Sequence, residues 1–138
     1  MSKYKESINE HDKTVTAKII VDGLTARYNK GIRAAISSRQ IIQMLSSRKN
    51  INITDSKLRK LIHYIVITGL PVNLVLCSSS KGYFLTNDPL TIKKHLDGLN
   101  DRISSQLKRY RAIERDLARL ENRKQIKLTD AFSMQEDD

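Results

Sequence analysis

The chain has 138 residues, which is enough for one compact domain and one extension. It carries 25 Lys and Arg against 15 Asp and Glu, a formal net charge of +10 at pH 7. An excess of this size indicates an anionic partner, and nucleic acid is the most common one. The sequence contains no tryptophan and no apolar run long enough to cross a bilayer, which argues against a membrane partner.

Residues 1–13 are polar and mixed in charge, and they lack the apolar core of a signal peptide. We therefore expect a flexible N-terminus and a cytoplasmic protein, in the host cytoplasm if the protein is viral. The single cysteine, Cys77, excludes an internal disulfide and a cysteine-based zinc site. It lies in an apolar run, so we expect it to be buried.

Three helices are predicted in the first half of the chain. Apolar residues at helical spacing indicate the first over residues 13–28, and residues 31–36 follow as a short strand. Ser37 and Gln40 form a capping box that opens the second helix. Thr54 or Asp55 caps the third, which runs to Thr68 and is stopped by Gly69. Its expected buried stripe has the i, i+3, i+4, i+7 spacing of Leu58, Leu61, Ile62 and Ile65.

Pro71 prevents any continuation of the third helix. Residues 72–77 and 82–86 are rich in strand-forming residues, and the polar segment 78–81 separates them, so a hairpin is expected. A three-helix unit closed by a hairpin is the arrangement of a winged helix-turn-helix. We assign residues 14–87 to this domain.

A long helix is expected over residues 88–123, with Pro89 in its first turn. Apolar residues recur at alternating spacings of four and three, which is typical of a coiled coil and predicts a homodimer. Its seam consists of Ile92, Leu96, Leu99, Ile103, Gln106, Tyr110, Ile113, Leu117 and Leu120. The fold class is therefore mainly α with a small β-hairpin, and a fold-back of the helix on its own domain is the alternative to the dimer. The basic residues between Lys108 and Lys124 are expected to form the solvated flanks of this helix.

The candidate DNA-binding surface centres on the third helix, opposite its apolar stripe. A helix fits the major groove, where Lys and Arg read guanine edges and polar residues near the N-terminus lie closest to the bases. The candidates on this helix are Ser56, Lys57, Arg59, Lys60, His63 and Tyr64. Arg39, at the start of the second helix, is a further candidate for phosphate contact. Lys81 at the hairpin tip, with the hydroxyls of Ser78, Ser79 and Ser80, is a candidate for phosphate contact or entry into the minor groove. A solvated basic face and a solubilising turn are the plain alternatives.

The last residues, 124–138, reverse the charge and are expected to form a flexible acidic tail. Gln125, Leu128 and Phe132 resemble the sliding-clamp interaction box of replication proteins, although Ala131 replaces the first aromatic residue of that box. The resemblance implies binding to a sliding clamp. A disordered tail is the alternative.

Four segments together resemble winged-helix DNA-binding proteins of phages and mobile elements that are found near replication genes. These segments are 35–40 (AISSRQ), 58–62 (LRKLI), 69–72 (GLPV) and 81–85 (KGYFL), and the resemblance covers about residues 30 to 120. It implies DNA binding, at a replication origin or a promoter.

We therefore expect a dimeric, sequence-specific protein that binds double-stranded DNA in replication or its control. A transcriptional regulator, or an adaptor whose winged helix and coiled coil bind proteins, is the alternative. The sequence contains no phosphate loop, no cluster of metal ligands and no nucleophile beside a plausible base. We expect neither an enzyme nor a cofactor.

Overall fold

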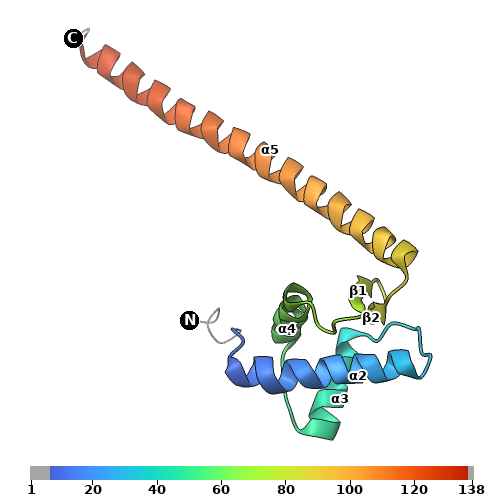
Figure 1. Ribbon diagram of the computed structural model, residues 1–138. Helices are drawn as coiled ribbons and strands as arrows, with labels where there is room; N and C mark the ends of the chain where they lie inside the picture. The colour runs from blue at the N-terminus through green and yellow to red at the C-terminus, as the bar shows by residue number, and fades with distance from the viewer. Residues whose placement is uncertain (1–6, 137–138) are drawn as a thin grey trace. The chain divides into compact units, whose positions relative to one another are not determined.

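The computed structural model describes residues 7–136, with side chains as far as Gln125. The described chain is mainly helical, with a small antiparallel sheet and a long C-terminal helix (Figure 1). It divides into two compact units, residues 1–95 and 96–138. The elements are the π-helical turn η1 (Asp12–Thr16), α2 (Ala17–Asn29), α3 (Ser38–Lys49), α4 (Asp55–Thr68), β1 (Val75–Ser79), β2 (Gly82–Thr86) and α5 (Pro89–Glu136).

The caps of α3 and α4 are those that the sequence predicts. The Ser37 Oγ accepts a hydrogen bond from the Gln40 backbone N–H at 3.1 Å, and the Ser37 N–H donates to the Gln40 Oε1 at 3.0 Å. The Thr54 Oγ1 accepts from the Lys57 N–H at 3.1 Å, and α4 ends at Gly69 in the left-handed conformation. These local hydrogen bonds set where the two helices begin and end.

One apolar core holds the N-terminal unit together. Helices α2, α3 and α4 surround it, and the hairpin of β1 and β2 contributes Leu76 and Leu85 (Figure 1). The predicted stripe of α4 lies inside it, and Cys77 is buried as expected. The helical core residues are Ala17, Ile20, Val21, Leu24, Ile41, Leu45, Leu58, Leu61, Ile62 and Ile65.

The hairpin forms, but its first strand begins later than predicted. Residues 72–74 turn before β1, and the Leu74 N–H donates to the Pro71 carbonyl at 3.4 Å. As a result Ser78 and Ser79 belong to the strand, opposite Tyr83 and Gly82. Only residues 80 and 81 remain in the turn, so the hairpin tip is shorter than the sequence indicated.

The predicted strand over residues 31–36 is wrong except at its last residue. Only Ile36 pairs with the hairpin, through two backbone hydrogen bonds to Tyr83 of 2.9 and 2.8 Å. The segment before it is a loop that begins at Gly31, whose φ is +79°, and Arg27 holds this loop by donating to the Ala34 carbonyl at 2.9 Å. Backbone groups of this loop form hydrogen bonds with side chains and within turns, so they are not available for pairing with a strand.

The N-terminus is not flexible over the whole of residues 1–13. Asn9 and Asp12 exchange two backbone-to-side-chain hydrogen bonds of 2.9 Å, which begins a helix at Glu10, before the predicted residue 13. Ile8 packs against the core, and Asp12 is buried. Residues 1–6 lie outside the described residues.

Helix α5 begins as predicted and continues further. Asp88 caps it by accepting hydrogen bonds from the Thr91 N–H at 3.2 Å and the Thr91 Oγ1 at 2.6 Å. The helical backbone extends to Glu136 rather than ending at residue 123, because no glycine or proline follows Gly98. The flexible tail predicted for residues 124–138 is therefore helical in its described backbone. In the described chain no helix has both the length and the apolar character that a membrane span requires.

Gly82 is the residue that allows the hairpin to approach Ile36. Its φ is +136°, and a Cβ atom at this position would lie 2.1 Å from the Ile36 carbonyl oxygen. We predict that Gly82→Ala lowers the free energy of unfolding by at least about 2 kcal/mol, through backbone strain and the loss of the Ile36 pairing.

Urea denaturation followed by circular dichroism would measure this change. Gly23→Ala is the matched control, because a Cβ there meets nothing within 4 Å in a helix and should stabilise by about 0.5–1 kcal/mol. If Gly82→Ala were as stable as the parent chain, the close contact between Gly82 and the Ile36 backbone would be disproved.

Candidate nucleic-acid interface

One side of α4 lies against the N-terminal turn η1 and is not open to a ligand. The Lys57 Nζ forms an ion pair with the Asp12 Oδ2 at 3.0 Å, and the two side chains are only 23% and 7% exposed. Lys57 therefore does not belong to an open basic surface, and the prediction that placed it there is wrong. The sequence gave no local sign of this partner because Asp12 lies 45 residues earlier in the chain.

The environment of Asp12 keeps its carboxylate charged. Burial alone would raise the pKa of Asp12, but the hydrogen bond from the Asn9 backbone and the hydrogen bond and charge of Lys57 outweigh it. The net result is a pKa below the ordinary value of 3.8. The ion pair therefore attaches the N-terminal turn to α4 at neutral pH.

Three other candidates on α4, Ser56, Lys60 and Tyr64, are half-buried. The Tyr64 ring packs against the core, and the Lys13 Nζ lies 5.7 Å from its centroid, at the distance of a cation–π contact. Lys57 and Tyr64, which lie on one side of α4, therefore make contacts within the protein.

The exposed face of α4 is basic only in its first half. Arg59 and His63 are exposed there, and neither makes a hydrogen bond or an ion pair within the described residues. Towards the C-terminus the same face becomes apolar, with Val66 and Ile67 exposed, Ile67 by 71%. Of the candidates expected over residues 56–64, the exposed ones are therefore Arg59 and His63, and Lys60 is half-buried.

A surface hollow brings together four of the candidates from outside α4. Arg39 lines it from the first turn of α3, and Ser79, Ser80 and Lys81 line it from the hairpin tip. None of the candidates on α4 lines this hollow. The hollow is also lined by Ser78, and by five residues that the sequence did not suggest for it: Ser37, Ser38, Asp55, Gly82 and Tyr83.

The chemistry of the hollow suits the phosphate backbone of a nucleic-acid strand that passes along its edge. In the first turn of α3 the capping box satisfies the Gln40 N–H, and the Ser38 and Arg39 N–H groups have no intrahelical carbonyl partner. Arg39 and Lys81 add two exposed cations. The Lys81 backbone N–H donates to the Ser79 Oγ at 3.2 Å, which shapes the turn. Asp55 also lines the hollow, and its carboxylate disfavours an isolated anion deep inside.

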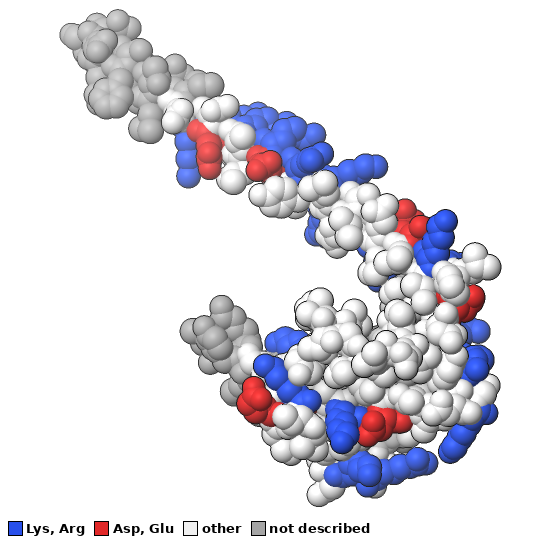
Figure 2. Space-filling model, viewed as in Figure 1, with Lys and Arg blue, Asp and Glu red and all other residues white. Residues whose placement is uncertain are grey.

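Basic side chains border the N-terminal unit in the view of Figure 2, and uncharged residues cover much of that face. The capping box of Ser37 and Gln40 was the sequence signal for one edge of the hollow, since it marks the helix N-terminus. The meeting of that edge with the hairpin tip follows from the Ile36–Tyr83 bridge, which connects residues far apart in the chain.

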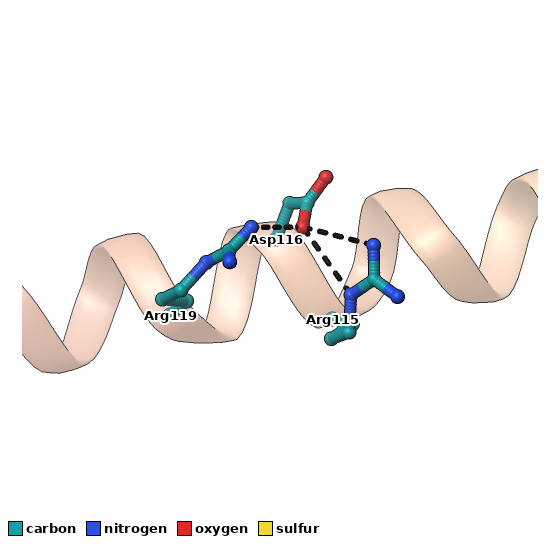
Figure 3. Close-up of polar contacts among 3 residues, drawn as sticks. All are labelled: Arg115, Asp116 and Arg119. Atoms are coloured by element: carbon teal, nitrogen blue, oxygen red, sulfur yellow. Dashed lines mark hydrogen bonds and ion pairs between the residues drawn. The ribbon is translucent and has the colours of Figure 1, made fainter.

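The C-terminal unit consists of the main part of α5, where basic and acidic side chains alternate. Asp116 lies between Arg115 and Arg119 on the helix surface and pairs with both (Figure 3). This agrees with the expectation of solvated charged flanks. Gln125 of the proposed clamp box ends the described side chains, and Leu128 and Phe132 lie outside them.

No group of three metal-ligating side chains occurs among the described residues. Comparisons of the chain with protein-family models, with curated proteins and with solved structures gave no match.

We predict that Asp12→Asn lowers the free energy of unfolding at pH 7 by about 1–3 kcal/mol, because Lys57 loses a charged partner. The pKa of Asp12 is lowered in the folded state, so its contribution is present above its ordinary pKa of 3.8 and is lost as the pH falls through the lower folded value. The difference between parent and variant should therefore shrink below about pH 4.

Thermal denaturation between pH 2.5 and 7 would test this. Asp22→Asn, at an exposed site on α2, is the control for a change of charge alone. A constant difference between Asp12→Asn and the parent across this range would argue against a charged Asp12.

Proposed function

We propose that the protein is a dimeric, sequence-specific protein that binds double-stranded DNA. In this proposal residues 14–87 act as a winged helix-turn-helix domain, with α3 and α4 as the helix pair and the β1–β2 hairpin as the wing. The observation that carries it is the hollow that Arg39 and Lys81 both line beside the N-terminus of α3. A helix N-terminus with cations on either side is suited to a phosphate backbone.

The role of α4 in this proposal is narrower than the sequence indicated. Arg59 and His63 are the exposed side chains that can reach base edges, since Lys57 is paired with Asp12. Arg is the side chain that most often reads guanine in the major groove. Lys60 and Tyr64, which are half-buried, contribute at the edge of the contact.

The second unit supports the dimer. The seam residues from Leu96 to Leu120 are 37–63% exposed where they are apolar, although their spacing is that of a coiled-coil core. A soluble chain with so long an apolar stripe needs a partner helix to cover it.

A role in replication of a virus or mobile element is proposed on the family resemblance of residues 30 to 120 and on the clamp-like box at Gln125, Leu128 and Phe132. A transcriptional regulator would use the same DNA-binding surface. One observation favours an adaptor instead: Val66, Ile67 and Val72 are exposed on the N-terminal unit and could bind a protein.

We predict that the triple variant Arg39→Ala/Arg59→Ala/Lys81→Ala weakens binding to duplex DNA by at least about 100-fold at 150 mM salt. Each lost phosphate contact should also reduce the slope of log K against log salt by about 0.9. Fluorescence anisotropy titrations on duplex and single-stranded DNA at several salt concentrations would measure both quantities.

The matched control is Lys18→Ala/Lys30→Ala/Lys49→Ala, which removes the same charge at exposed sites outside the hollow. It should retain most of the affinity. Equal losses in the two triple variants would mean that net charge alone carries the binding, and the proposed interface would then be wrong. If the parent chain does not bind duplex DNA, the adaptor is the better proposal.

A further inference from the structure

The direction in which two α5 helices pair can be derived from the charges beside their seam. This inference rests on the dimer proposed above and goes further, because the seam alone does not distinguish parallel from antiparallel helices. In a coiled coil the residues flanking the seam contact the partner and set its orientation. Over residues 100–123 of α5, one flank carries Arg102, Arg109, Asp116 and Arg123, and the other carries Asn100, Leu107, Glu114 and Glu121.

In a parallel pair of α5 helices, the charges on these flanks would gain little net attraction. Each residue of the first flank then faces the residue five positions later on the second flank of the partner. Arg109 would face the partner's Glu114, which is favourable. However, Asp116 would face the partner's Glu121, and Arg102 would face the partner's Leu107. One attraction is thus offset by one repulsion, and an exposed leucine is left against a cation.

In an antiparallel pair of α5 helices, the seam residues pack against each other favourably. In the register that covers the whole exposed seam, Leu96 packs against the partner's Leu120 and Ile103 against the partner's Ile113. The central layer then places Gln106 beside the partner's Tyr110, whose hydroxyl can satisfy the amide. Every apolar seam residue from Leu96 to Leu120 meets a partner in this register.

The flanks also match in this register. Arg102 faces the partner's Asp116, and two-fold symmetry repeats the pair. Leu107, which is 45% exposed in the single chain, meets its own copy at the two-fold axis and is covered. An unfavourable contact brings the two Arg109 side chains together at the same level, where both can extend into solvent.

From these pairings we propose that the protein dimerises through an antiparallel coiled coil of two α5 helices, centred near Gln106 and Leu107. The two α5 N-termini, and with them the attachment points of the proposed DNA-binding domains, then lie about 57 Å apart along the coiled coil. A parallel pair would place them side by side.

A distance measurement tests the orientation directly. We would attach a nitroxide label at Asn122→Cys on the outer face of α5 in the full chain and measure the label-to-label distance by double electron–electron resonance. Antiparallel helices predict about 42 Å, because position 122 lies opposite position 94 of the partner. Parallel helices predict about 20 Å. The unsubstituted chain is the labelling control, since Cys77 is fully buried and burial raises the pKa of its thiol.

Charge reversal provides an independent test. Arg102 makes no ion pair within the described residues, so Arg102→Glu changes little in the single chain. It should weaken the dimer by roughly 10-fold, since two attractions become repulsions. Adding Asp116→Arg should restore most of the affinity, although this second change removes the intrahelical contacts of Figure 3. Lys108→Glu, with the same charge change on the outer face, should leave the dimer intact.

Glu114→Arg also distinguishes the two orientations, but, unlike Arg102→Glu, it should weaken the parallel dimer and not the antiparallel one. It should have little effect in the antiparallel pair, where Glu114 faces the partner's Asn100. It should weaken a parallel pair, where it faces the partner's Arg109. Sedimentation equilibrium of all these chains gives the dissociation constants.

A label distance near 20 Å in a dimeric chain, or loss of the dimer in Glu114→Arg but not in Arg102→Glu, would overturn the antiparallel pairing and leave the dimer. A monomeric parent chain at micromolar concentration would overturn the dimer itself. DNA binding by the parent chain is measured separately, so either result is distinguishable from a failure of the DNA-binding proposal.

Discussion

The burial of one stripe of α4 is the constraint on which the N-terminal unit depends. Leu58, Leu61 and Ile65 have no solvent exposure, so the helix has one rotational setting in the core. That setting turns Lys57 towards η1 and leaves Arg59 and His63 open. The packing of the buried face of α4 therefore determines which residues of the helix are exposed to a ligand.

The ion pair of Asp12 and Lys57 shows how a basic residue can serve the fold rather than a ligand. A lysine at this position would extend the cationic surface if it were unpaired, but its partly buried carboxylate partner neutralises it. Removing either charge would leave the other partly buried and unpaired, which is costly. The exposed cations that remain beside the N-terminus of α3 are Arg39 and Lys81, which line the hollow between α3 and the hairpin.

The C-terminal unit poses a different physical problem. Helix α5 contributes no residue to the apolar core, and its apolar seam from Leu96 to Leu120 is exposed in the single chain. Its stability as a helix comes from good helix-forming residues and from pairs such as Arg119 with Asp116, which contribute only modestly (Figure 3). Covering the seam with a second α5 is the largest gain in buried apolar surface open to it.

Helix periodicity, the capping box at Ser37, the stop at Gly69 and the opening of α5 at Asp88 were all readable from short stretches of sequence, because each depends on residues within one helical turn. The predictions of a strand over residues 31–36, of an unstructured segment at residues 8–13 and of an open Lys57 were wrong for the opposite reason. Each depends on a contact between distant segments: Ile36 with Tyr83, Ile8 with the core, and Asp12 with Lys57. Propensity cannot anticipate such contacts, because their free energy arises only once the chain is packed.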